Sequence, residues 1–156
     1  MHRGRLGPIL LLPLALVVSA CDDPTLSSSI TRTGSSPTAV LNLTGAWAGT
    51  ATDSGGQVQM VWQLTQRGAN VTGTVRATNN VGLQLYTGSV AATLAASILT
   101  FTVTVPSGSI SDLPDCSIAL SGSATDVQAS SMSGTYTGIH SCLGAMEGGR
   151  LILIKQ

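Results

Sequence analysis

Apolar and polar residues alternate along most of the chain after position 40, and this period of two limits the fold more than any other feature. In the segment 97–105, Leu99, Phe101 and Val103 alternate with threonines. Successive side chains of a β-strand point to opposite faces, so a segment of this kind forms a strand with one buried face. The segment 57–66 follows the same rule. The chain is therefore predicted to be all-β.

Eight segments with this pattern are separated by turn-forming residues. The links are too short for the crossover connection that parallel strands need, so neighbouring strands are predicted to be antiparallel. A meander of this size avoids open edges by closing, which predicts a small antiparallel eight-stranded up-and-down β-barrel. A β-sandwich with the same number of strands is the main alternative. The predicted strands span residues 43–52, 57–66, 71–78, 84–93, 97–105, 116–125, 131–138 and 149–155.

A short pattern recurs in five of these segments: an apolar residue, a hydroxyl residue, glycine, a small residue, then an apolar or small one. The glycine falls on the apolar face, where it favours a tight bend or a close approach of backbone, as a narrow barrel requires. Small inward residues could instead leave a ligand cavity, but side chains can fill an eight-stranded barrel, and we expect a filled core. The pattern occurs at Leu43–Trp47, Val71–Val75, Tyr86–Val90, Leu120–Ala124 and Met132–Tyr136.

Six large side chains on the apolar faces are candidates for either the barrel core or the wall of a ligand pocket. They include all five aromatic residues of the chain, so none is left to build the two aromatic girdles of a membrane-spanning barrel. We therefore expect the apolar faces to point into the barrel rather than into lipid. The six residues are Trp47, Met60, Trp62, Tyr86, Phe101 and Tyr136.

The elements LTGAWAG, VTGTV, YTGSV and SGTYTG resemble the strand pattern of avidins and, more loosely, of lipocalins. The resemblance implies an eight-stranded up-and-down barrel that holds a small ligand in one mouth. The biotin site of avidins does not carry over. Gly49 stands where the avidin pattern has asparagine, Val75 stands where it has tyrosine, and no tryptophan-rich strand is present.

The first 20 residues have the pattern of a secretory signal peptide. Arg3 and Arg5 precede an apolar stretch that is too short to span a membrane and that ends on small residues. The sequence VSAC, which ends at Cys21, resembles the lipobox of bacterial lipoproteins. The resemblance implies cleavage after Ala20 and lipidation of Cys21. An ordinary secretory signal with an incidental cysteine is the alternative.

Residues 21–40 are rich in serine, threonine and proline and show no period, so they are predicted to form a disordered linker behind the lipid anchor. The barrel domain is predicted to occupy residues 41–156. With several acyl chains on Cys21, the protein is expected to be held stably at the bacterial cell envelope, on the inner membrane, the outer membrane or the cell surface.

Two further cysteines, Cys116 and Cys142, are expected to form a disulfide because the predicted compartment is oxidising. In a meander they lie at the same end of the barrel, at the start of the sixth strand and after the seventh. A metal site that includes His140 and a carboxylate is the alternative. Two distant cysteines and one histidine do not form a zinc-binding pattern, so no metal is predicted.

Charge and motifs exclude several classes of function. The chain has seven Lys and Arg residues and seven Asp and Glu residues, without a basic cluster, so nucleic acid is not an expected partner. No nucleophile elbow or paired base is present, which predicts a non-catalytic protein without a cofactor. Asp112, Asp115 and Glu147 could gather around a cation, but a solvated rim is the expected role of acids on loops.

Two functions remain. In the first, the barrel mouth binds a small apolar ligand, as in the families that the chain resembles. In the second, the domain is an envelope protein-interaction module, such as a lysozyme or protease inhibitor. It would act through the loops predicted at 106–115 and 139–148, braced by the disulfide. The oligomeric state is not predicted.

Overall fold

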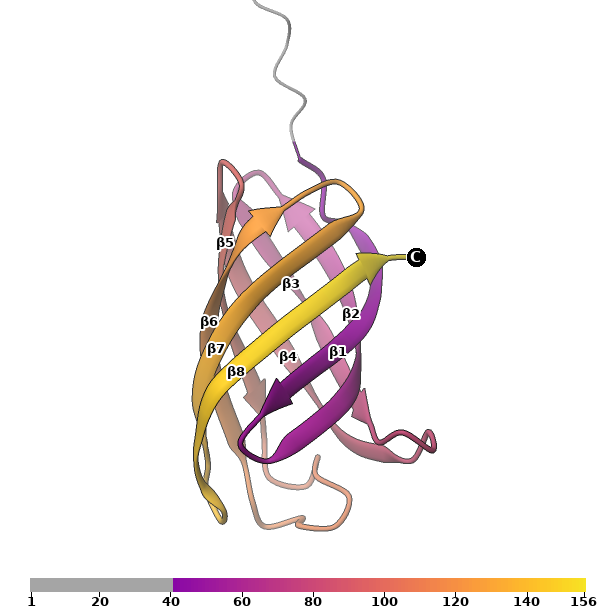
Figure 1. Ribbon diagram of the computed structural model, residues 1–156, viewed down its shortest axis with the longest axis vertical. Helices are drawn as coiled ribbons and strands as arrows, with labels where there is room; N and C mark the ends of the chain where they lie inside the picture. Colours follow the sequence, from indigo (N-terminus) through magenta and orange to yellow (C-terminus); the bar gives the residue numbers. More distant parts are fainter. Residues whose placement is uncertain (1–40) are drawn as a thin grey trace, which may run out of the picture. The chain divides into compact units, whose positions relative to one another are not determined.

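The computed structural model describes residues 41–156, which form a closed barrel of eight antiparallel strands in chain order (Figure 1). The strands are β1 (Gly45–Asp53), β2 (Gly56–Arg67), β3 (Asn70–Thr78), β4 (Gln84–Ala95), β5 (Ile98–Val105), β6 (Ile118–Val127), β7 (Ser131–His140) and β8 (Gly144–Lys155). Pairing of β1 with β8 closes the barrel, which confirms the predicted fold and excludes the sandwich. The predicted signal peptide (1–20), Cys21 and the linker (21–40) lie outside the described residues.

The alternation of the sequence becomes the inside and the outside of the barrel. Along β5 every second residue is buried, and the threonines between them are exposed. The buried side chains of all eight strands form one hydrophobic core. Residues 41–156 contain no helix, and thus none that is long and apolar enough to cross a membrane.

Glycines let the backbones of neighbouring strands approach closely inside the narrow barrel. At Gly49 a Cβ atom would overlap the backbone carbonyl of Ile152 on β8, and at Gly88 it would meet the carbonyl of Thr104 on β5. These positions provide curvature rather than empty space, as the filled-core expectation requires. The same crowding by a neighbouring strand's backbone occurs at Gly73, Gly122, Gly134, Gly138 and Gly149.

Side chains from outside the strands extend the core at both ends of the barrel. At the end that holds Leu41 and the C-terminus, Leu43 is fully buried, and its backbone N–H donates to Oε1 of Gln66. At the opposite end, which we call the disulfide end, Ile110 of the 105–118 loop is buried against β4. The five predicted aromatic residues are all buried, so none of them lines an open mouth at either end.

The strand boundaries agree with the sequence within about two residues at most places, but the eighth strand does not. The loop predicted at 139–148 is wrong, because β7 extends to His140 and β8 begins at Gly144 instead of residue 149. The pairing register shifts between Tyr136 and Gly138, which marks a bulge. A bulge inserts an extra residue and breaks the period of two, so the strand is not visible in the sequence pattern.

Candidate functional site

All six large residues that the sequence proposed as core or ligand wall are buried inside the barrel, and none is more than 7 % exposed. Trp62 and Phe101 pack edge to face, with ring centroids 5.3 Å apart. In the pairing register Trp47 of β1 lies directly opposite Trp62, and Met60 lies two residues before Trp62 on β2. All six side chains belong to the one hydrophobic core cluster, so they are core residues in this structure.

The two indole N–H groups of the core differ in their hydrogen bonding. Nε1 of Trp47 donates to the backbone carbonyl of Leu43 over 2.8 Å. Nε1 of Trp62 is buried and has no hydrogen-bond partner among the described residues. An unpaired buried donor costs about 1–3 kcal/mol, so this N–H offsets part of the stability that burial of the Trp62 ring provides.

A polar cluster of two tyrosines and an aspartate lies near the disulfide end. The hydroxyl of Tyr136 on β7 donates to Oδ2 of Asp53, 2.7 Å away at the end of β1. The other carboxylate oxygen, Oδ1, accepts the backbone N–H of Gly55 in the turn between β1 and β2. The carboxylate therefore ties β7 to this turn, and it carries out the turn chemistry expected of an aspartate there.

Burial and the nearby carboxylate keep both phenols neutral. Burial, with the charge of Asp53 as a smaller cause, raises the pKa of Tyr86 to about 12. The pKa of Tyr136 is raised still further, first by burial and then by its hydrogen bond to Asp53 and by the charge of that carboxylate.

Because the chain has only two tyrosines, these pKa shifts predict a clear alkaline titration. Phenols of the unfolded chain ionise near pH 10. Below that pH the raised pKa values do not change the free energy of unfolding with pH, so the folded state keeps the full stabilising contribution of its two neutral phenols. This contribution is lost progressively as the pH rises through about 12. Tyrosinate absorbance should be absent from the folded protein at pH 10.5 and present in denaturant. Either phenol ionising near pH 10 in the folded protein would contradict the cluster.

A groove on the outer wall of the barrel is a second candidate for binding, with a volume of about 690 Å³. It forms where β4 separates from β5. Their pairing ends at Ser89 and Thr104, beyond which the loop after β5 runs along β4 instead. The N–H of Thr87 donates to the carbonyl of Ser109, and the N–H of Ser111 donates to that of Leu85. This loop becomes one wall of the groove.

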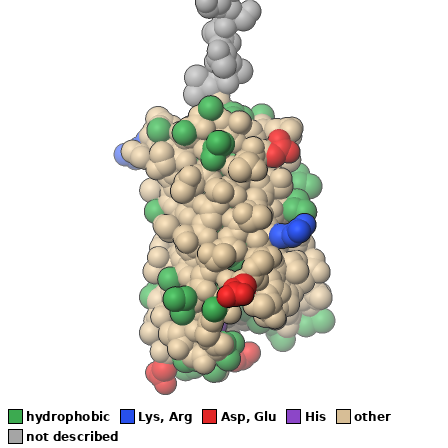
Figure 2. Space-filling model, turned by 60° about the vertical axis from the view of Figure 1, so that its left-hand side comes forward, with side chains coloured by type: hydrophobic (Ala, Val, Ile, Leu, Met, Phe, Trp, Pro, Cys, Tyr) green, Lys and Arg blue, Asp and Glu red, His purple; other side chains and the backbone are tan. Residues whose placement is uncertain are grey.

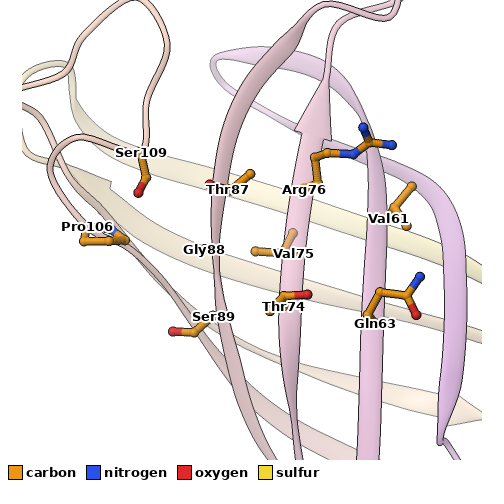
Figure 3. A pocket seen from close by; sticks show the side chains of 10 residues that line it. All are labelled: Val61, Gln63, Thr74, Val75, Arg76, Thr87, Gly88, Ser89, Pro106 and Ser109. Carbon is orange, nitrogen blue, oxygen red and sulfur yellow. The ribbon is translucent and has the colours of Figure 1, made fainter.

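Two rows of outward side chains cross β2, β3 and β4 and form the rest of the groove (Figure 3). One row consists of Val61, Arg76 and Thr87, and the other of Gln63, Thr74 and Ser89. Pro106 and Ser109 face them from the loop, and the Arg76 side chain extends to the β2 side of the groove, near Val61 (Figure 3).

The groove combines apolar atoms, several hydroxyl groups and one cation. Such a mixture suits a ligand with an apolar body and a polar or acidic head. Arg76 is exposed, and its guanidinium offers five donors to an anion. On the face of the barrel that Figure 2 shows, most of the surface is uncharged polar side chains and backbone, with only scattered charges. Among the described residues that line this groove, Arg76 is the one with a charged side chain.

The disulfide end contains the cysteine pair and the buried His140. Cys116 and Cys142 form the predicted disulfide, with Cα atoms 5.8 Å apart. Nδ1 of His140 accepts the backbone N–H groups of Cys142 and Leu143. Within residues 41–156, these three side chains are the one group of His, Cys, Asp or Glu residues placed closely enough to share a metal ion. Among the residues that the structure describes, Asp112, Asp115 and Glu147 form no such group.

Comparisons with known proteins identify the fold and no family. No protein-family model matches the chain, and no curated protein sequence does. A solved structure, that of EF1p2_mFAP2b bound to DFHBI, has a TM-score of 0.55 and 19 % sequence identity to this chain. The alignment covers 73 % of this chain and 94 % of that one. At this identity the similarity concerns the barrel fold alone.

Proposed function

We propose that this protein is a non-catalytic, lipid-anchored component of the bacterial cell envelope, and that its barrel binds a small amphipathic ligand in the outer groove of β2, β3 and β4. The observation that carries the proposal is the groove itself, with a volume of about 690 Å³ and with Arg76 beside apolar atoms. The similar barrel of EF1p2_mFAP2b was solved with DFHBI bound, which supports ligand binding by a barrel of this architecture.

The groove suits a ligand better than the interior does. The interior is filled by the aromatic and aliphatic core, and its glycines are in contact with neighbouring backbone. A ligand there would have to displace packed side chains, which commonly costs several kcal/mol. The groove is already formed, so binding requires little reorganisation.

Arg76 favours an acidic head group on the ligand. It lies between Val61 and Thr87 in its row, so a carboxylate bound to the guanidinium would place an attached alkyl chain along the groove. The loop wall at Pro106 would cover the other side of that chain. A medium-chain fatty acid has this chemistry and serves as a probe.

Dodecanoate is expected to bind the protein, and Arg76→Ala is expected to weaken this binding by a factor of about 1.4 to 5. An exposed ion pair contributes about 0.2–1 kcal/mol, which sets the size of the effect. Isothermal titration calorimetry of the soluble protein measures it directly.

The matched control is Arg67→Ala, which removes the same charge at the end of β2, outside the groove. Its affinity for dodecanoate should equal that of the wild type. Equal loss in both variants would show a general charge effect, and absence of binding to the wild type would overturn the proposed ligand class.

The anchor makes a separate prediction about location. Cys21→Ala removes the acceptor of the lipid, so the protein should move from the membrane fraction to the soluble fraction on cell fractionation. Cys142→Ala, which leaves the lipobox intact, should remain with the membranes. A Cys21→Ala protein that stays in the membrane fraction would contradict the lipoprotein assignment.

The second candidate function, an inhibitor of an envelope enzyme such as a lysozyme or protease, is favoured by apolar side chains at the disulfide end. Val81 and Leu83 in the loop between β3 and β4, and Leu143 in the turn between β7 and β8, are each at least 65 % exposed. Such side chains are common in protein interfaces. Inhibition that survives Arg76→Ala and is lost in Leu143→Asp would support this function over ligand binding.

A further inference from the structure

Cys116, His140 and Cys142 come together from three places at the disulfide end. Cys116 precedes β6, His140 ends β7, and Cys142 lies in the turn before β8. Their sulfur and nitrogen atoms all lie within 4.8 Å of one another. Cys116 and His140 are buried, and Cys142 is exposed, so one side of the group is open to solvent.

Backbone pairing holds this group in place independently of the disulfide. His140 pairs with Ile118 in the register of β6 and β7. Beyond the ends of these strands, the N–H of Ser141 donates to the carbonyl of Ser117, and the N–H of Ser117 donates to Oγ of Ser141. These hydrogen bonds lie between the cysteines and the strands, so the two thiols would remain neighbours after reduction.

The histidine presents a lone pair to the same turn. Nδ1 accepts the N–H groups of Cys142 and Leu143 over 3.2 and 3.3 Å, both long for hydrogen bonds of this type. Nδ1 thus faces the turn as a hydrogen-bond acceptor, and a metal ion there would compete only with these two weak contacts. Tetrahedral zinc with sulfur ligands at about 2.3 Å and nitrogen at about 2.0–2.1 Å places its ligand atoms about 4 Å apart. The two sulfur atoms, which are bonded to each other in the disulfide, would move apart to this distance after reduction, and no ligand atom of the group now lies more than 4.8 Å from another.

We propose that reduction of the disulfide converts this group into a Zn²⁺ site formed by the thiolates of Cys116 and Cys142 and by Nδ1 of His140, with one coordination position open to water. A dithiol reductant transfers two electrons and two protons to the disulfide and becomes a disulfide itself. Binding of Zn²⁺ by the two thiols then releases two protons. The disulfide and the metal exclude each other, because the same sulfur atoms form both.

The experiment uses the full-length chain with His2→Ala and Cys21→Ser, in which Cys116, Cys142 and His140 are the sole cysteines and histidine. Co²⁺ serves as a spectroscopic probe and Zn²⁺ as its competitor. Each titration is carried out on protein whose disulfide has been reduced by a phosphine and on protein whose disulfide is intact. The reduced protein should bind one Co²⁺ per chain with thiolate-to-cobalt charge-transfer absorption, which one equivalent of Zn²⁺ abolishes. The oxidised protein should give no such absorption.

Two variants test the ligands in a protein whose fold is checked by circular dichroism. Cys142→Ser changes an exposed side chain and should abolish the charge-transfer absorption of a two-thiolate site. His140→Gln retains an acceptor for the turn and should weaken Co²⁺ binding by more than the 10–100-fold typical of changes beyond the ligands. The proposal is overturned if the reduced protein binds no metal, or if the Cys142→Ser variant binds it with unchanged affinity and spectrum.

Discussion

Replacement of Trp62 by alanine is expected to lower the free energy of unfolding by about 3–5 kcal/mol. Trp62 is 1 % exposed and packs edge-on against Phe101 in the centre of the core, so its removal leaves a large cavity. A domain of this size has a stability of about 5–15 kcal/mol, and the variant should melt at a much lower temperature. Chemical denaturation measures the difference. A Trp62→Ala protein of unchanged stability would mean that the residue lines an open pocket instead of filling the core.

The two Trp→Phe variants provide the matched comparison. Trp62→Phe removes an unpaired buried N–H, which offsets part of the volume lost. Trp47→Phe removes a comparable volume but also leaves the carbonyl of Leu43 without its donor. Trp47→Phe should therefore be less stable than Trp62→Phe by about 1–3 kcal/mol. Equal stabilities would show that the Trp62 N–H finds a partner in solution, such as a bound water.

Reduction of the Cys116–Cys142 disulfide is expected to lower the free energy of unfolding by about 3–4 kcal/mol in the absence of zinc. The bridge joins residues 26 positions apart, and a loop of this length loses that much entropy in the unfolded chain. Denaturation with and without reductant, in the presence of a chelator, measures the effect. The Cys116→Ala, Cys142→Ala double variant should have the stability of the reduced protein and should not respond to reductant.

The same sample tests the pairing of the cysteines. Thiol titration of the unfolded, unreduced Cys21→Ser protein should find no free thiol, and peptide mapping should find the 116–142 link. Two free thiols in protein purified under oxidising conditions would contradict the disulfide. Without a disulfide, reductant would also not change the free energy of unfolding of the barrel.

The barrel could be predicted from the sequence because its signals are local and repeated. The alternation around Phe101 places one face inside, and the short turns leave the antiparallel meander as the simplest arrangement. The recurrent glycines were assigned to curvature, and the crowding of Gly73, Gly122 and Gly134 by neighbouring backbone agrees with that assignment.

The groove could not be predicted, because it depends on pairing between distant segments. Arg76 and Thr87 appear in the sequence as ordinary outward residues of two strands. The loop wall of the groove arises only because β4 separates from β5 near Gly88 and the loop after β5 returns along β4 at Ser109. The sequence instead suggested an open mouth, but the buried Leu43 extends the core at one end.

The cluster of Asp53 and Tyr136 was missed for a similar reason. The two residues are 83 positions apart, and their contact follows from the closure of the barrel through β8. The early start of β8 was hidden by the bulge after Tyr136, which disrupts the pattern that reveals the other strands. Long-range closure and bulges are thus the features that a period of two does not encode.

We propose that the barrel binds its ligand in the outer groove and not in its interior. Titration of the isotope-labelled protein with dodecanoate, followed by amide and indole NMR signals, tests it directly. We predict shifts for the amides of Thr74, Arg76, Thr87 and Ser109, while the indole N–H signal of Trp62 stays unchanged. A shift of the Trp62 indole signal with unchanged groove amides would place the ligand in the core and contradict the account.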